Sequence, residues 1–352
     1  MSGVDSPEMV PKVCVVGAGI MGLSTALQIA ETIPGVEVTI LAEDYPPNIS
    51  SSAAGGYIVM AYFMKEDIPK DYEANSARKK ATFDHCQRLF FSKEVAETGV
   101  QLVNLYRIAK TEEKEEDKPV DCDNYLGFRP MTQNEMKMFP AHRRGYSYRT
   151  YVINQSIYLP WLMKKVRELG VRMVKRKLKY LGEVANDFDI IVNCSGAAAR
   201  DLVNDNEITM IRGHNLKVKA PWLKIALFDE NTHLIVLPIN DHVILGTTWH
   251  PNDLDPEPRL ADRKHILNIC SSVFPAMKDV EVVGEMVGWR PVRASLERVE
   301  KEEMENGGKR FTVVHNYGHG KEGITLHWGS AIDAANLVRE SLQTMKPTLA
   351  KL

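Results

Sequence analysis

A glycine-rich turn near the N-terminus constrains the fold of this chain more than any other feature of its sequence. Residues 15–22 read VVGAGIMG, follow a short apolar strand predicted at 13–16 and begin a predicted helix with apolar residues at helical spacing. A second predicted strand, 36–41, is followed by Glu43, about twenty residues after the last glycine of the turn. Strand, glycine turn, helix, strand and acidic residue in this order predict a dinucleotide-binding βαβ unit.

The residues of this turn suit a pyrophosphate for separate physical reasons. Gly17 permits a tight turn, Gly19 lets backbone N–H groups approach the phosphates, and Gly22 lets the helix pack closely on the strand. The positive end of the helix dipole favours the negative charge of the phosphates. We expect the carboxylate of Glu43 to accept hydrogen bonds from the adenosine ribose hydroxyls.

The turn alone does not distinguish NAD from FAD, but two later segments favour FAD. The loop 50–56 (SSSAAGG) offers small residues and hydroxyl groups to the phosphates and ring of an extended cofactor. The segment 318–325 (GHGKEGIT) precedes a predicted helix, 328–339, whose N-terminus would stabilise negative charge on a reduced flavin. A glycine-rich loop that only reverses the chain direction explains this second segment equally well.

The length of the chain and the style of its predicted strands indicate two domains. A chain of 352 residues is longer than one hydrophobic core usually serves. The predicted strand 188–194 is wholly buried in character and is followed by a glycine, like the first strand. Residues 216–218, 234–237 and 242–245 instead resemble antiparallel strands separated by turn residues. We therefore expect an α/β fold in which a parallel nucleotide-binding domain is interleaved with an antiparallel substrate domain.

Charge, hydropathy and cysteine content exclude several other classes of protein. Lys and Arg total 44 against 46 Asp and Glu, so the net charge of −2 offers no field for nucleic acid. No stretch reaches the roughly 18 apolar residues that a membrane span needs. The five cysteines are scattered and never in CxxC spacing. They predict neither a disulfide framework nor a metal site, and they suit a reducing compartment.

Seven segments spread over most of the chain resemble the D-amino-acid oxidase family, most of all its D-aspartate oxidase branch. They are VVGAGIMGLSTA (15–26), LGFRPMT (126–132), YLPWL (158–162), FDIIVNCSG (188–196), RGHNLKVKAPW (212–222), GWRPVR (288–293) and VVHNYGHGKEGITLHWG (313–329). The resemblance implies an FAD-dependent enzyme that oxidises a D-amino acid to an imino acid, which water hydrolyses to a 2-oxo acid and ammonia. Dioxygen is the second substrate and hydrogen peroxide the second product.

The same resemblance implies how the chain is divided and which residues bind each ligand. A Rossmann-like FAD-binding domain of the glutathione-reductase type is expected from segments 12–60, 150–205 and 304–345, and an antiparallel-sheet substrate domain from 61–149 and 206–303. Arg290 is expected to bind the substrate carboxylate, because a guanidinium grips a carboxylate through two parallel hydrogen bonds. Arg293 is expected to be structural. The remaining FAD-binding positions implied are Ala18, Gly19, Ile20, Glu43, Ser50, Gly55, Ser195, Gly196, His319, Gly320, Gly323, Ile324 and Thr325. For His319, satisfying local backbone groups is an equal alternative.

Three positions depart from the family pattern and concern the substrate. Ile235 stands where the family has a tyrosine that helps to bind the carboxylate, and Trp249 stands where the D-aspartate branch has an arginine that reads the acidic side chain. Lys321 replaces a small residue; it is either a solvated lysine or a cation that attracts an acidic substrate. We expect D-aspartate or D-glutamate slightly ahead of neutral D-amino acids. A flavin-binding protein that has lost turnover, or an oxidase of glycine or sarcosine, are the alternatives.

Two further segments concern the location and the surface of the protein. The chain ends in Ala350-Lys351-Leu352, a variant of the SKL signal that the peroxisomal import receptor reads. Together with the implied release of peroxide, this predicts a peroxisomal matrix protein, with the cytoplasm as the alternative. The charged run around 111–117 predicts an exposed loop.

Overall fold

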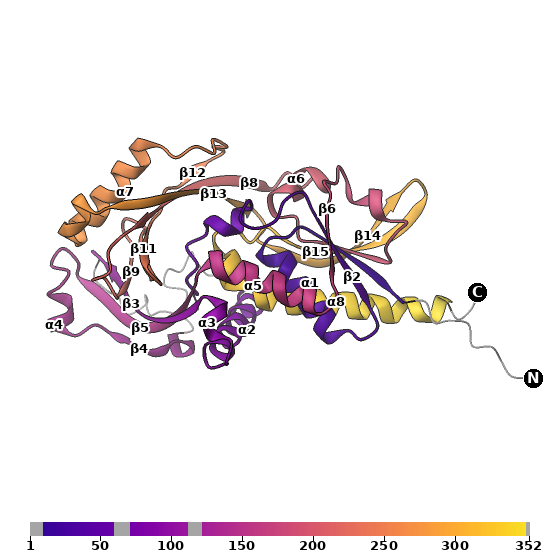
Figure 1. The fold of residues 1–352 in the computed structure, drawn as a ribbon, viewed down its shortest axis with the longest axis horizontal. Helices are drawn as coiled ribbons and strands as arrows, with labels where there is room; N and C mark the ends of the chain where they lie inside the picture. Colours follow the sequence, from indigo (N-terminus) through magenta and orange to yellow (C-terminus); the bar gives the residue numbers. More distant parts are fainter. Residues whose placement is uncertain (1–9, 60–70, 112–121, 350–352) are drawn as a thin grey trace, which may run out of the picture.

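The computed structural model describes residues 10–59, 71–111 and 122–349, and their strands form two sheets (Figure 1). One sheet is mainly parallel and the other mainly antiparallel, which confirms the predicted α/β class. Apart from Thr111, the charged run at 111–117 lies outside the described residues, and so does the C-terminal tripeptide.

The smaller sheet brings the ends of three parallel strands to one edge. Its order is β14–β15–β7–β1–β2–β6, and all neighbours are parallel except β14 and β15. The register places Val16 at the end of β1 beside Leu41 of β2 and Asn193 of β7, so the loops that follow meet at one edge, where α/β sheets bind ligands. The strands are β1 (Lys12–Val16), β2 (Glu37–Ala42), β6 (Arg172–Lys175), β7 (Ile190–Asn193), β14 (Arg298–Asn306) and β15 (Lys309–Tyr317).

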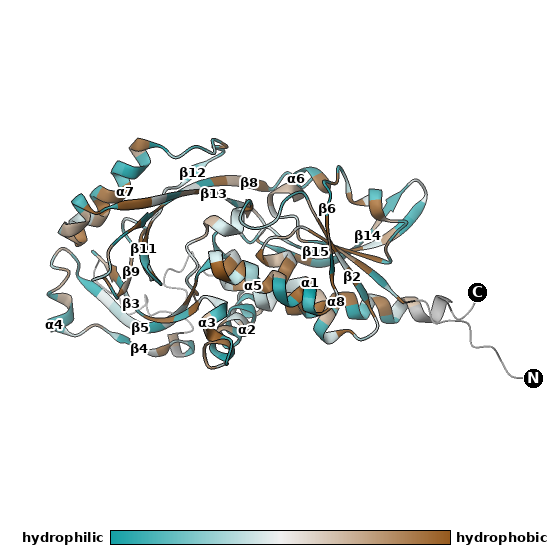
Figure 2. Ribbon diagram, in the orientation of Figure 1, coloured by the Kyte–Doolittle hydropathy of each residue, from teal (hydrophilic) through white to brown (hydrophobic). Residues whose placement is uncertain are grey.

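Helices cover one face of the smaller sheet, and short turns cover the other. Val13 of β1 packs with Leu23 of α1 (Ile20–Thr32), Leu162 of α5 (Gln155–Glu168) and residues of α8 (Gly323–Leu349). On the opposite face Cys14 packs with Leu181 of η5 (Leu181–Val184) and with α6 (Ala199–Leu202), which follows η6 (Gly196–Ala198). Strands buried on both faces are apolar throughout, as the central strands of this sheet are in Figure 2.

The larger sheet is strongly curved (Figure 1) and has α7 on one face. Its order is β12–β8–β11–β10–β9–β3–β5–β4, with β13 paired to the other side of β8. Ile266 and Cys270 of α7 (Leu260–Val273), together with Met277 of η7 (Pro275–Asp279), pack against Leu216 and Val243 of the sheet. The strands are β3 (Val100–Ala109), β4 (Leu126–Pro130), β5 (Arg144–Ile153), β8 (Ile208–Val218), β9 (Ala226–Asp229), β10 (Leu234–Ile239), β11 (His242–Gly246), β12 (His250–Pro251) and β13 (Val282–Arg293).

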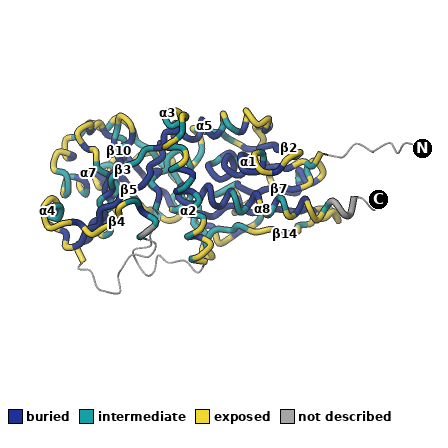
Figure 3. The backbone as a smooth tube through the Cα atoms, turned by 90° about the horizontal axis from the view of Figure 1, so that it is seen from below, coloured by how far each residue is buried: buried dark blue, intermediate teal, exposed yellow. Residues whose placement is uncertain are grey.

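Two of the predicted domain boundaries fall inside strands. The predicted boundary at 150 falls inside β5, which belongs to the larger sheet as far as Ile153. The boundary at 304 falls inside β14, which pairs with β15 over its whole length. The sequence of β14, RVEKEEMEN, has no apolar alternation, because this edge strand is largely exposed (Figure 3). The remaining elements are η1 (Ser50–Ala53), α2 (Tyr72–Phe90), α3 (Val95–Thr98), η4 (Cys122–Asn124), α4 (Gln133–Met136) and η8 (Gly320–Glu322).

Candidate active site

One large cavity, of about 2150 Å³, is lined by residues of both sheets. It receives the glycine turn after β1, the ends of β2 and β7, the loop that contains η1, and the η8–α8 segment. Strands β8, β10, β11 and β13 of the larger sheet line its other side. Of the residues predicted to bind cofactor or substrate, all line this cavity except Gly22.

The glycine turn has the geometry expected of a phosphate-binding turn. Gly17 adopts a φ of +106°, and a Cβ there would meet the Cys194 carbonyl oxygen at 2.5 Å. Gly22 lies beneath the turn, where a Cβ would overlap the Gly17 carbonyl oxygen. Gly22 therefore allows the close packing of α1 that the sequence predicts for it, and its contribution to the cofactor site is made through the position of the turn, because it does not line the cavity itself. The backbone N–H of Ile20, at the start of α1, donates to Ser51 Oγ at 3.1 Å, a contact that the sequence did not suggest.

The acidic residue and the end of β7 lie on either side of this turn. Glu43 is exposed, and its Oε1 accepts a hydrogen bond from Lys177 Nζ at 2.8 Å. Ser195 Oγ donates to Asn193 Oδ1 at 2.6 Å, and Gly196 follows with a φ of +59°. The Ser195 hydroxyl, the Glu43 carboxylate and the glycine turn all line the cavity, and the sequence predicts that they bind the adenosine half of the cofactor.

The start of α8 lies against the loop that follows η1. Thr325 Oγ1 accepts a hydrogen bond from the Val59 N–H at 3.2 Å. His319 is buried, and its Nε2 lies 3.1 Å from Ser330 Oγ, so its imidazole contacts a side chain of α8. Desolvation lowers the pKa of His319 to about 3, which leaves the ring neutral at physiological pH.

The donor and acceptor groups of this cavity fit a dinucleotide cofactor. Two buried amide oxygens that line it, Asn316 Oδ1 and Gln155 Oε1, have no hydrogen-bond partner among the described residues. Buried acceptors normally have partners, and the ribityl O–H groups and the ring N–H group of a flavin are donors of the required kind. A side chain at position 19 would crowd Ser51, so the glycine there leaves room for phosphate oxygens beside the backbone.

Arg290 enters the same cavity from β13 as a partly buried cation. Its Nη2 donates to Thr247 Oγ1 at 2.6 Å, its Nη1 donates to the Thr248 carbonyl at 3.3 Å, and its Cζ lies 5.2 Å from the centre of the Trp249 ring. It forms no ion pair with a carboxylate of residues 10–59, 71–111 or 122–349. Desolvation lowers its pKa to about 10, so the group keeps its charge at neutral pH.

Arg293, three residues further along β13, has the opposite environment. Its Nε lies 2.8 Å from Asp205 Oδ2 and its Nη2 lies 2.8 Å from Glu207 Oε2. This guanidinium is compensated by two carboxylates and does not line the cavity. Only Arg290 of this pair is placed to bind an anion from solution.

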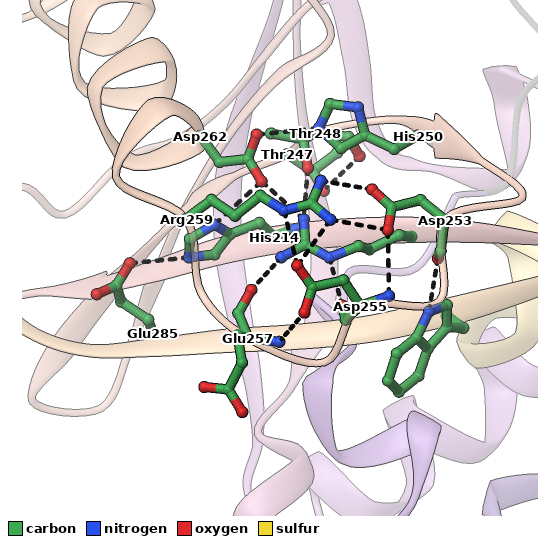
Figure 4. Close-up of polar contacts among 12 residues, drawn as sticks. His214, Thr247, Thr248, His250, Asp253, Asp255, Glu257, Arg259, Asp262 and Glu285 are labelled. Atoms are coloured by element: carbon green, nitrogen blue, oxygen red, sulfur yellow. Dashed lines mark hydrogen bonds and ion pairs between the residues drawn. The ribbon is translucent and has the colours of Figure 1, made fainter.

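A glycine and a polar network support Arg290, and neither was predicted. A Cβ at Gly213 of β8 would overlap the Arg290 guanidinium, so only glycine allows it to lie flat on the strand. Behind Thr248, the backbone N–H of His214 donates to the Thr248 hydroxyl at 3.0 Å. The His214 imidazole lies between two carboxylates (Figure 4), 3.5 Å from Asp262 Oδ2 and 2.9 Å from Glu285 Oε2. This network holds the backbone that carries the carbonyl acceptor of Arg290.

The side chains of Phe228, Ile235 and Trp249 form an apolar wall of the cavity. Ile235 of β10 is in register with Phe228 of β9, and both line the cavity. Trp249, of which 50% remains exposed, completes the wall at the cavity edge. Phe228 was not singled out in the sequence, because it lies outside the segments that carry the resemblance. Lys321, in η8, also lines the cavity and is exposed.

No group of three or more His, Cys, Asp or Glu side chains in the described part of the chain is arranged to hold a metal ion. No helix within the described ranges is long and apolar enough to cross a membrane.

Comparison with known proteins agrees with this geometry. The family model described as FAD dependent oxidoreductase matches residues 12–337. The human protein named D-aspartate oxidase is 35% identical over 97% of this chain and 98% of its own length, and D-aspartate oxidase 1 of Caenorhabditis elegans is 33% identical over 96% and 100%. Among solved structures, the glycine oxidase of Geobacillus kaustophilus has the same fold, with a TM-score of 0.76 at 19% identity over 94% of this chain and 95% of that chain. The chain therefore belongs to the D-amino-acid oxidase family of FAD-dependent oxidoreductases, as the sequence segments predicted.

Proposed function

We propose that this protein catalyses the oxidative deamination of D-amino acids, and that Arg290 binds the substrate carboxylate. The observation that carries the proposal is a partly buried guanidinium, in the same cavity as the phosphate turn, without a carboxylate partner among the described residues. An α-amino acid supplies one carboxylate, which such a fork binds through two charge-assisted hydrogen bonds.

FAD, held by the glycine turn, the loop after η1 and the start of α8, would supply a ring that can accept a hydride and pass two electrons to dioxygen, with hydrogen peroxide as the product. The chain itself binds, orients and desolvates the substrate. Arg290 holds the carboxylate, the wall of Phe228 and Ile235 excludes water from the amino acid, and the trapped orientation favours hydride transfer over a random encounter. The remaining residues predicted to bind FAD or substrate, including Lys321, keep those roles in this proposal. The segments 12–60, 150–205 and 304–345 remain its proposed cofactor half, and 61–149 and 206–303 its proposed substrate half, except that β5 keeps residues up to Ile153 in the larger sheet and β14 brings residues from Arg298 into the smaller one.

Acidic and neutral D-amino acids are both candidates, for different reasons. The relatives at 33% and 35% identity named D-aspartate oxidase favour D-aspartate and D-glutamate. The wall formed by Phe228, Ile235 and Trp249 favours a neutral side chain, because these three side chains are apolar and the Arg107 guanidinium beside Phe228 is already paired with Glu230. Comparing kcat/KM for D-aspartate and D-alanine decides between them.

An anaerobic flavin-reduction screen tests the proposal. FAD-loaded protein is mixed with each D-amino acid and its L-enantiomer, and flavin absorbance is followed; peroxide release is then measured in air. We expect bleaching by at least one D-amino acid and by none of the L-enantiomers. If no D-amino acid bleaches the flavin, the protein binds FAD without turnover; bleaching by N-methylglycine alone makes it an amine oxidase of another class.

The C-terminal tripeptide supports recognition by the peroxisomal import receptor and a location in the peroxisomal matrix. Release of peroxide also suits that compartment. A fluorescent fusion whose C-terminal residues are Ala350-Lys351-Leu352 should concentrate in peroxisomes, and removal of Leu352 should leave it in the cytoplasm.

A further inference from the structure

Three buried polar side chains, each from a different helix, form one hydrogen-bonded chain beside the start of α8. His85 of α2 has its Nε2 2.9 Å from the hydroxyl of Tyr158 in α5, and that hydroxyl lies 2.9 Å from Nε2 of His327 in α8. The three residues are at most 4% exposed, and none of them lines the cavity. These three side chains therefore make no direct contact with the ligands that the cavity binds.

The direction of every hydrogen bond in this chain follows from its last acceptor. His327 Nδ1 lies 2.7 Å from the carbonyl oxygen of Ile324, which only accepts, so Nδ1 carries the proton. Desolvation lowers the pKa of His327 to about 4, so its Nε2 is an unprotonated acceptor for the Tyr158 hydroxyl. The Tyr158 oxygen in turn accepts from the Nε2–H of His85, whose ring stacks on Trp328 at 3.5 Å. Because only one set of donors and acceptors is allowed, these hydrogen bonds hold the three side chains in one arrangement.

Helix α2 makes further contacts with the same turns of α8 (Figure 1). Lys79 Nζ lies 3.0 Å from Glu322 Oε2, just before α8 begins. Thr82 Oγ1 accepts hydrogen bonds from the N–H groups of Trp328 and Gly329, both at 3.3 Å. A Cβ at Gly329 would overlap the backbone of α2, so the two helices are in direct contact there. The first two turns of α8 are thus held by residues of α2 that do not line the cavity.

Those turns are the part of α8 that faces the cavity. Gly323, Ile324 and Thr325 line it, and the Ile324 carbonyl is the group to which His327 donates. We propose that His85, Tyr158 and His327 are positioning residues for FAD. The hydrogen bonds of these three side chains hold the first turn of α8 in the position that binds the cofactor. The proposal rests on the FAD site of the proposed function but does not depend on which amino acid is oxidised.

Titration of FAD into FAD-free protein tests this directly. Tyr158→Phe removes the donor to His327 and the acceptor of His85, and we expect the Kd for FAD to rise about tenfold. The matched control is Tyr151→Phe: Tyr151 is also fully buried, but its hydroxyl has no hydrogen-bond partner among the described residues. This control should keep the Kd within about twofold of the wild type. Hydrogen exchange of the 323–329 amides should accelerate in Tyr158→Phe only.

A second pair of variants guards against misfolding and separates positioning from general stability. His85→Phe keeps the ring on Trp328 but removes the donor, and should raise the Kd for FAD several-fold. His85→Gln restores an amide donor and should recover part of the affinity. A Kd for FAD that is unchanged in both Tyr158→Phe and His85→Phe overturns the proposal. An FAD-binding protein that oxidises no D-amino acid contradicts the proposed function and leaves this proposal standing.

Discussion

The guanidinium carbon of Arg290 lies 5.2 Å from the centre of the Trp249 ring, while its two terminal nitrogens donate to Thr247 and Thr248. An aromatic face stabilises a cation without neutralising it, whereas a carboxylate partner would occupy the same donors. Arg290 therefore keeps its charge for a ligand, in contrast to Arg293, which two carboxylates compensate.

Replacing Arg290 by lysine should separate charge from geometry. Lysine keeps the positive charge but lacks the planar fork, so we expect KM for the best D-amino acid to rise about 10- to 100-fold. Arg293→Lys is the control; it should lower stability and leave KM within about twofold. Equal KM values for Arg290→Lys and the wild type, from initial rates of peroxide release, would show that another group binds the carboxylate.

The isoleucine at 235 offers a gain-of-function test. Ile235→Tyr introduces a hydroxyl into the cavity wall beside Phe228, and we expect KM to fall by about tenfold because the substrate carboxylate gains a hydrogen bond. Ile235→Phe adds the ring without the hydroxyl. If both variants have the same KM, the hydroxyl contributes nothing to carboxylate binding.

Gly22 tests the packing beneath the phosphate turn. A methyl group there would overlap the Gly17 carbonyl, so Gly22→Ala should displace the turn, weaken FAD binding at least about tenfold and destabilise the fold by about 1–3 kcal/mol. Gly284→Ala is the control, because a Cβ there makes only ordinary contacts with Lys217 at 3.6 Å. The measurements are FAD titration and chemical denaturation. Wild-type affinity in Gly22→Ala would contradict the packing argument.

The buried histidines make stability depend on pH in a defined direction. Desolvation lowers the pKa of His319 from 6.5 to about 3, so between these values the unfolded chain binds more protons than the folded one. The free energy of unfolding should therefore fall as the pH is lowered through this window, by at most about 1.4 kcal/mol per pH unit for this residue. His315 and His327, with pKa values lowered to about 4, act in the same direction.

Chemical denaturation at pH 7 and pH 5 measures this effect. The variant His319→Gln should lose less stability between these pH values than the wild type, because glutamine does not titrate. His265→Gln, which changes an exposed histidine of α7, should behave as the wild type does. An identical pH dependence in all three proteins would mean that His319 is not protonated on unfolding.

The local part of the cofactor site was predictable, and its supports were not. A glycine turn between a strand and a helix is a property of neighbouring residues, so spacing alone indicated Gly17 and Gly19. The hydrogen bond from Ile20 to Ser51 spans 31 residues, and the bond between Tyr158 and His327 spans 169. Contacts of such separation leave no periodicity in the sequence. Gly213 is likewise one of 23 glycines in the sequence, and only the pairing of β8 with β13 places it against Arg290.

The sequence by itself determined that this chain contains a dinucleotide-binding βαβ unit, two styles of sheet and the segments of an oxidase family, because each follows from short-range spacing or from motif residues. Only the tertiary structure decided that β14 joins the smaller sheet, and that Arg290 has no carboxylate partner among the described residues while Arg293 has two. By residue type alone, two arginines three residues apart on one strand carry the same chemistry, and only the family resemblance assigned them different roles in the sequence. The fold gives them different neighbours: Asp205 and Glu207 form ion pairs with Arg293, whereas the indole of Trp249 lies against Arg290. Arg293 is therefore neutralised within the protein, and Arg290 keeps its charge for a ligand.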